Sequence, residues 1–136
     1  MNVMKILIEL LSAGVIMGIL DFIWLGFVAK KLYYDEMGKL LRKKPNMAAA
    51  LAFYVIYVVG VVVFVVNPAV QMDSLLYATV LGALFGLVAY STYDLTNLAT
   101  MKDFPLKITV IDLIWGIIIT AVTASGAFWV SRVLGI

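Results

Sequence analysis

The chain has 136 residues, of which 65% are hydrophobic and only 13% are charged, and its net charge is +2. A soluble domain carries about 25% charged residues because its surface faces water, so most of this chain's surface must face lipid. A single membrane domain, residues 1–136, is therefore predicted. The sequence contains no cysteine and no histidine. This excludes disulfides and argues against zinc, iron–sulfur and haem sites and against Ser-His or Cys-His nucleophiles.

Four segments are apolar and long enough to cross a bilayer as helices, which takes about 20 residues. We predict them at residues 4–29, 47–66, 74–99 and 106–133. Helix-breaking proline, asparagine and aspartate residues lie in the intervals between them. The predicted fold class is an all-α integral membrane four-helix bundle.

The connection after the first span is long enough to have structure of its own. In residues 31–44 the apolar side chains of Tyr33, Met37, Leu40 and Leu41 recur at helical spacing, and most of the others are charged. This pattern predicts a short basic amphipathic helix lying on the cytoplasmic membrane surface. The alternative is a polar connector with its tyrosines at the interface.

Lysine and arginine residues are concentrated in two of the three connections. The positive-inside rule places such connections in the cytoplasm. Both termini are therefore expected outside the cytoplasm, and the basic residues indicate membrane orientation rather than a nucleic-acid partner. The residues concerned are Lys30, Lys31, Lys39, Arg42, Lys43, Lys44, Lys102 and Lys107.

Three aspartates interrupt the apolar spans: Asp21, Asp94 and Asp112. With the orientation above, all three fall in the cytoplasmic half of the bilayer, and each shares its helix face with small or hydroxyl residues. Such residues are typical of helix–helix contacts, so the three carboxyls are expected to face one another. A charged residue at the centre of a membrane helix costs about 2.5–3.5 kcal/mol, which makes these aspartates functional candidates. The alternative is that they are shallow and only hold helices together.

Clustered carboxylates repel, so they can share a proton or attract a cation. One candidate ligand is a hard cation, Mg²⁺, Ca²⁺ or Na⁺, with Asn97 as a further oxygen donor. Another is a cationic small molecule held against aromatic faces. No other cofactor is evident. The predicted ligand- or ion-binding residues are Asp21, Asp94, Asp112, Asn97, Tyr90, Tyr93, Trp24 and Trp115.

Three strings carry a family resemblance: Asp21-Phe22-Ile23-Trp24, Tyr93-Asp94-Leu95-Thr96-Asn97 and Asp112-Leu113-Ile114-Trp115-Gly116. Over essentially its whole length, the chain resembles a bacterial family of small four-span proteins described only as predicted membrane proteins of unknown function. The resemblance implies a protein of the bacterial inner membrane and supplies no activity. Asp-x-Ile-Trp occurs in the first and fourth spans, but the glycine pairs align at another offset, so an internal duplication stays an open hypothesis.

Three functions fit these patterns. The first is a small transporter or binding protein whose aspartate site opens to the cytoplasm; four spans are few for a transport pathway, so a homodimer formed through a glycine face (Gly14 and Gly18, or Gly82 and Gly86) is expected. The second is an enzyme that acts on a lipid or lipid-linked substrate with paired aspartates as acid and base. The third is a structural or accessory subunit. Apart from the homodimer, the lipid bilayer is the expected partner.

Overall fold

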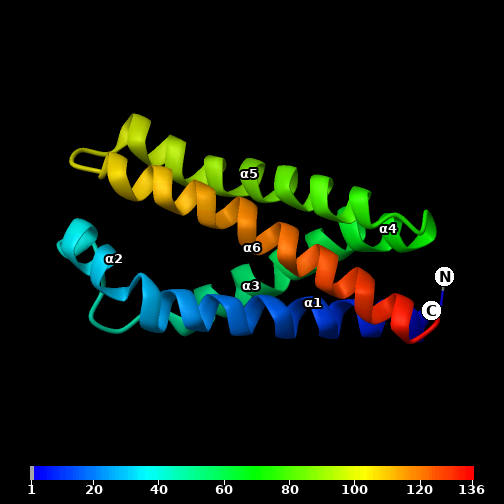
Figure 1. The fold of residues 1–136 in the computed structure, drawn as a ribbon. Coiled ribbons are helices and arrows are strands. Elements are labelled where there is room, and N and C mark those ends of the chain that lie inside the picture. Colours follow the sequence, from blue (N-terminus) through cyan, green and yellow to red (C-terminus); the bar gives the residue numbers. More distant parts are fainter. Residues whose placement is uncertain (1) are drawn as a thin grey trace.

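The computed structural model describes residues 2–136 and is an all-helical bundle (Figure 1). Four helical segments are long and apolar enough to cross a membrane: Val3–Val28, Met47–Gln71, Leu75–Thr100 and Leu106–Val133. The predicted fold class is confirmed. Large apolar side chains, including Leu11, cover the outside of the bundle, as a lipid-facing surface requires.

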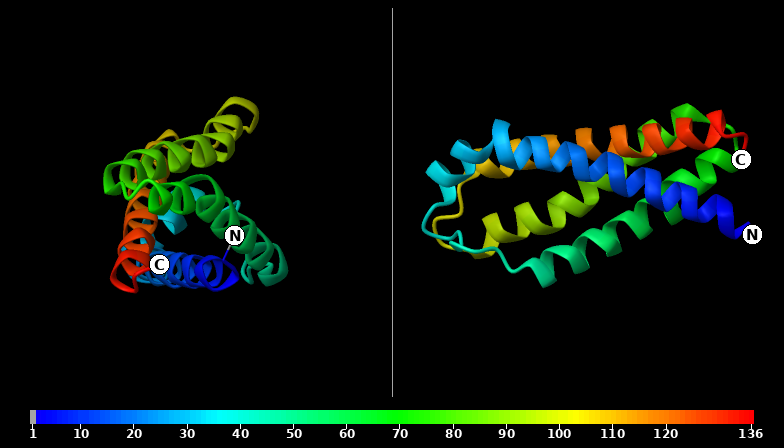
Figure 2. Two further views of the ribbon diagram at one scale, coloured as in Figure 1. Left: turned by 90° about the vertical axis from the view of Figure 1, so that its right-hand side faces the viewer. Right: turned by 90° about the horizontal axis from the view of Figure 1, so that it is seen from below.

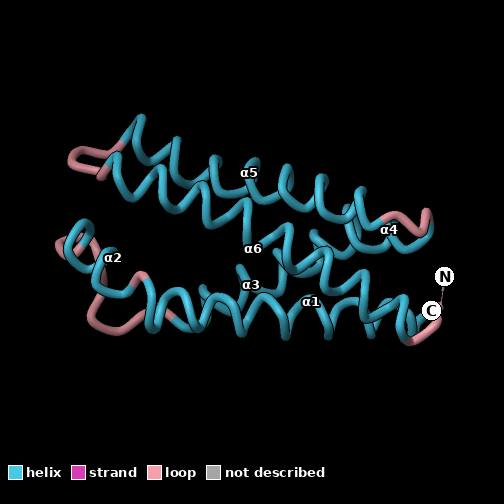
Figure 3. Tube along the Cα trace, viewed as in Figure 1, coloured by secondary structure: helices cyan, strands magenta, loops and turns pink. Residues whose placement is uncertain are grey.

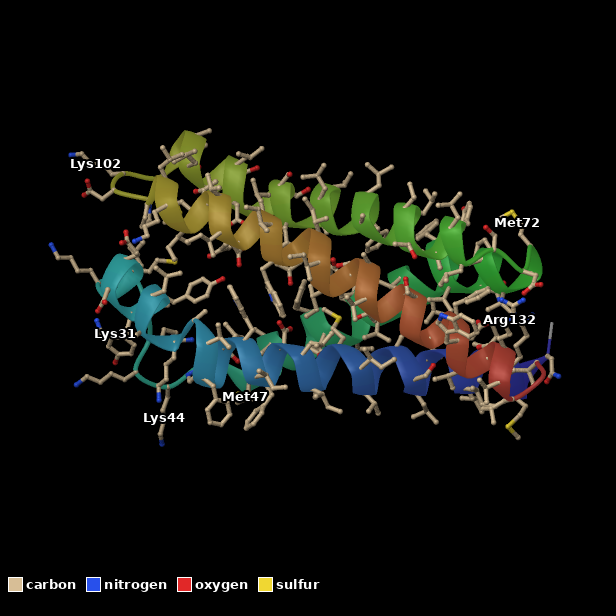
Figure 4. All side chains as sticks on the ribbon, in the orientation of Figure 1. Lys31, Lys44, Met47, Met72, Lys102 and Arg132 are labelled. Carbon is tan, nitrogen blue, oxygen red and sulfur yellow. The ribbon has the colours of Figure 1, made fainter. Side chains whose placement is uncertain are left out.

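Both termini lie at one end of the bundle, here called the terminal end (Figure 1). The connections at residues 29–46 and 101–105 lie at the opposite end, here called the basic end. Lys31, Lys44 and Lys102 project from the basic end, whereas Arg132 lies at the terminal end (Figure 4). The structure thus places the cationic connections on one side of the bundle, as the positive-inside argument requires.

The second span runs further than the sequence indicated. It consists of α3 (Met47–Val61), a π-helical turn η2 (Val62–Val66) and α4 (Asn67–Gln71), so the predicted end at residue 66 is wrong. Proline lacks an N–H group, and in a regular α-helix its ring clashes with the carbonyl four residues back. The wider turn of η2 ends at Val66, and Pro68 is the second residue of α4, so the span continues past the proline.

The third and fourth spans are α5 (Leu75–Thr100) and α6 (Leu106–Val133), which pack as a close antiparallel pair. Gly86 faces the backbone of Gly116, and Gly82 faces Ala124. Small residues permit such close approach in lipid, where packing drives helix association.

The glycine pair of the first helix is also used within the chain. On α1 (Val3–Ile23), Gly14 faces Val58 and Gly18 faces Tyr54, both on α3. Gly82 and Gly86 are buried against α6, and Gly14 and Gly18 are half-buried against α3, so both glycine pairs make contacts within one chain.

The two halves of the bundle are packed differently. Toward the terminal end an apolar core closes the interior, with Met17, Val61, Val65 and Phe128 at most 1% exposed. Toward the basic end α3 separates from its neighbours (Figure 2, right), and all of its residues from Met47 to Phe53 are exposed. The splayed half leaves room for a site.

The connection after the first span packs against the bundle. The first span ends in a π-helical segment η1 (Trp24–Val28), and α2 (Lys30–Met37) then crosses the basic end of the bundle toward α6 (Figure 3). Met37 is buried against Phe104 and Ile108. The amphipathic helix is present as predicted, but its apolar face covers the bundle, because there it finds protein contacts that a surface position lacks.

Candidate functional site

A cavity of about 450 Å³ lies between the spans in the splayed half of the bundle. Its size falls within the range of about 300–1,000 Å³ typical of small-molecule sites. The lining combines two carboxylates with aromatic rings from every span and from α2. The lining residues are Asp21, Trp24, Leu25, Tyr33, Phe53, Tyr57, Ala89, Tyr90, Tyr93, Asp112 and Trp115.

The two Asp-x-x-Trp motifs meet in a crossed arrangement at this cavity. The indole rings of Trp24 and Trp115 stack with their centroids 4.4 Å apart and their planes 7° apart. The Trp115 indole N–H donates to the Asp21 carboxylate at 3.2 Å. The Trp24 N–H donates to the Tyr33 hydroxyl at 3.2 Å, and that hydroxyl donates to Asp112 at 2.6 Å. The tryptophan of each motif therefore supports the aspartate of the other, in one case through Tyr33.

Asp94 occupies a different position from the other two aspartates. It comes from α5, is fully buried and does not line the cavity. Neither of its carboxyl oxygens accepts a hydrogen bond from any donor within residues 2–136. Its carboxyl lies against that of Asp112, and the two can bond only if one of them carries a proton.

Aromatic and hydroxyl side chains close the cavity toward the terminal end. The hydroxyls of Tyr57 and Thr120 are hydrogen-bonded at 2.8 Å. The Tyr57 ring meets the Tyr90 ring edge-on, with centroids 6.1 Å apart, and the apolar core lies beyond. The cavity is therefore a blind pocket and does not continue through the bundle.

Comparison with known proteins identifies the family of this chain. A family model described as "Predicted membrane protein (DUF2177)" matches residues 6–129. The chain belongs to this family. No curated protein and no solved structure matches the sequence. Membership in this DUF2177 family confirms the resemblance inferred from the sequence motifs and adds no activity to it.

In this family member, the structure brings together most of the residues proposed from the sequence. Asp21, Asp112 and four of the proposed aromatic residues line the cavity, and Asp94 lies directly behind Asp112. Asn97 is half-buried and does not line the cavity. Within residues 2–136, no three acidic side chains are gathered as the ligands of one metal ion.

Sequence reasoning missed Tyr33, Phe53 and Tyr57 as lining residues. The sequence predicts Tyr33 on the apolar face of an amphipathic helix at the membrane surface, and nothing in the local pattern indicates that this face packs against the bundle. Tyr57 carried a usable signal, since a hydroxyl in the middle of an apolar span needs a partner, and its partner is Thr120. Phe53 lies in a uniformly apolar segment, where no pattern distinguishes it.

Tyr33 provides a pH-dependent prediction. Burial and the hydrogen bond to Asp112 raise the pKa of its phenol well above the ordinary value of about 10. Because the unfolded chain ionises this phenol first, the stabilisation is complete below about pH 10 and is lost as the pH rises from there toward the native pKa. The unfolding free energy of the wild type should therefore fall faster above pH 10 than that of Tyr33→Phe, by up to about 1.4 kcal/mol per pH unit.

Below pH 10, Tyr33→Phe should be less stable than the wild type by about 1–2 kcal/mol, since it loses the bond to Asp112. Denaturant titration in mild detergent, monitored by circular dichroism, measures both effects. Tyr34→Phe is the matched control, because the neighbouring Tyr34 is exposed. Equal alkaline slopes for the wild type and Tyr33→Phe would contradict the assignment.

Proposed function

We propose that this protein binds a small organic cation in the cavity, as a transporter or binding protein of the bacterial inner membrane. The observation that carries the proposal is the combination of Asp21 and Asp112 with a wall of aromatic rings in a blind pocket. Aromatic faces attract cations by about 2 kcal/mol or more where water is excluded. Carboxylates add a full opposite charge.

The two carboxylates are available to a ligand. Asp21 accepts one hydrogen bond, from Trp115, and Asp112 accepts one, from Tyr33, and both donors are neutral. Within residues 2–136 no lysine or arginine forms an ion pair with either of them. A carboxylate has about four acceptor positions, so each retains charge and lone pairs for a cation.

The enzyme hypothesis is less well supported by this geometry. Asp94 adjoins Asp112, but it is fully buried and does not line the cavity. A substrate in the cavity would therefore meet Asp21 and Asp112, which are held by two different donors, Trp115 and Tyr33. We further propose that the basic end faces the cytoplasm, because it holds the lysine-rich connections.

Equilibrium dialysis with tetraphenylphosphonium, an aromatic organic cation, tests the proposal. The purified wild type should bind it saturably, with one ligand per chain. Asp21→Asn and Asp112→Asn should each weaken binding at least tenfold, since a loss of only about 1.4 kcal/mol of attraction has this effect. Asp103→Asn is the matched control: Asp103 is exposed in the loop before α6 and its backbone has φ 63°, which asparagine tolerates.

The outcomes separate the functions. Tight binding by the wild type and by Asp103→Asn, lost in both cavity variants, supports the proposal. No saturable binding by the wild type, or equal binding by all four proteins, would overturn it.

A further inference from the structure

The cavity is closed at both ends and open at one side. The apolar core closes it toward the terminal end, and α2 covers it at the basic end, where Met37 packs against Phe104 and Ile108. At the side, the lining residues Leu25, Phe53 and Tyr93 are 54%, 51% and 54% exposed. About half of the surface of each of these residues is therefore exposed on the outside of the bundle.

These three residues lie on different elements and within the membrane-spanning segments. Leu25 belongs to η1, Phe53 to the separated half of α3, and Tyr93 to α5. The separation of α3 and α5 toward the basic end is visible in Figure 2 (right). We call Leu25, Phe53 and Tyr93 the side opening. Since its three residues all belong to membrane-spanning segments, the opening faces hydrocarbon rather than water.

From this geometry we infer that the ligand is an amphiphile, with a cationic headgroup between Asp21 and Asp112 and a hydrocarbon chain that passes through the side opening into the bilayer. The inference rests on the proposed function and specifies its substrate class. It is carried by charge complementarity inside the cavity and by apolar side chains at the opening. A cation without a chain would leave the apolar opening unused.

The chemistry inside the cavity changes from polar to apolar along this path. The Asp21 and Asp112 carboxylates lie beside the stacked indoles of Trp24 and Trp115. At the opening the lining is the Phe53 ring, the Leu25 side chain and the Tyr93 ring. Such a gradient matches the two parts of an amphiphile. A compact, water-soluble cation would need polar groups on all sides of its path.

Two quaternary ammonium probes that differ only in one chain test the inference: tetramethylammonium and dodecyltrimethylammonium. Binding is followed in phosphatidylcholine nanodiscs by the fluorescence of the cavity tryptophans. The sequence has three tryptophans, and Trp129→Phe removes the one outside the cavity. The fluorescence change is plotted against the free aqueous concentration for tetramethylammonium. For the dodecyl cation, which partitions into the bilayer, it is plotted against the mole fraction in the bilayer. Decyl maltoside, added at the same mole fraction, supplies a chain without a charge.

The dodecyl cation should change the fluorescence saturably, with one ligand per chain, at a mole fraction where decyl maltoside has no effect. Half-saturation of the protein by the dodecyl cation defines an aqueous concentration of that cation in equilibrium with the bilayer. The dissociation constant of tetramethylammonium should be at least thirtyfold higher than this concentration. Leu25→Asn, which makes the opening polar, should lower the affinity ratio of the two probes about tenfold. Val15→Asn is its control, because Val15 is similarly exposed on the same span but does not line the cavity.

Each other result has a definite meaning. If both probes bind equally well, or if the ratio is the same in Leu25→Asn and the wild type, the chain does not use the opening and the inference is overturned. In that event tetraphenylphosphonium binding would still support the proposed function. If decyl maltoside competes as well as the dodecyl cation, the cavity takes any apolar chain and the cationic headgroup is refuted. If neither cation nor tetraphenylphosphonium binds, both proposals fail.

Discussion

Gly86→Ala is expected to destabilise the bundle by forcing α5 away from α6. A methyl group at Gly86 would overlap the carbonyl oxygen of Gly116 and lie 2.7 Å from the Thr120 hydroxyl oxygen. A backbone carbonyl cannot rotate away as a side chain can, so the helices themselves must move. Overpacking of this kind costs about 1–3 kcal/mol. The free energy of unfolding in mixed detergent micelles should fall by this amount, and cation binding should weaken because Tyr90 and Asp112 lie at the same helix pair.

The matched control is the same substitution in the first span. A methyl group at Gly14 would meet only a Val58 methyl group at 4.0 Å, which is ordinary van der Waals contact. Gly14→Ala should therefore be neutral, or stabilising by about 0.5–1 kcal/mol, because alanine favours helix more than glycine does. If Gly86→Ala were as stable as Gly14→Ala, the close approach of α5 and α6 would be refuted.

The sequence predicted most of the fold because lipid makes the pattern simple. A span must be long, apolar and helical, so the four segments and their number could be inferred directly. The error at residue 66 arose from a local rule, since proline normally ends a helix. The π-helical turn that allows Pro68 to continue the span has no recognised sequence pattern.

The aspartates could be inferred as a cluster, whereas the fold of α2 could not. Helical spacing determines which face of a span carries an aspartate, and the positions of the basic connections determine its depth. By contrast, α2 is a short segment between two spans, and its charged surface fits both a membrane surface and the covered end of a bundle. The covered position is favoured by tertiary contacts: Tyr33 bonds to Asp112, and Met37 packs on residues of the fourth span and the loop before it. A local sequence pattern contains no information on such contacts.

The crossed Asp-x-x-Trp arrangement shows why two copies of one motif serve one site. Because α1 and α6 contact each other and run in opposite directions, the two motifs lie side by side with opposite chain directions, and their tryptophans stack. Each tryptophan then reaches beyond its own helix, toward the aspartate of the other motif. This local symmetry is compatible with a duplicated origin. It also gives a direct reason why both motifs contain the same two residues: each supplies one charge and one donor.

Asp94→Asn is expected to stabilise the bundle without weakening cation binding. Asp94 is fully buried, and neither of its carboxyl oxygens accepts a hydrogen bond within residues 2–136. A buried polar group that has no hydrogen-bond partner costs about 1–3 kcal/mol, and a charged group costs more. The free energy of unfolding of Asp94→Asn should therefore exceed that of the wild type by about 1–3 kcal/mol.

In Asp94→Asn the amide N–H group can donate to the adjoining Asp112 carboxylate, which the Asp94 carboxylate cannot do. Asp94 does not line the cavity, so tetraphenylphosphonium binding should stay within about twofold of the wild type. Denaturant titration in mixed detergent micelles measures the stability, and equilibrium dialysis measures the binding. Asp103→Asn is again the matched control and should change neither quantity. A bundle less stable than the wild type, or a loss of binding as large as that in Asp112→Asn, would show that the site requires the Asp94 carboxylate itself.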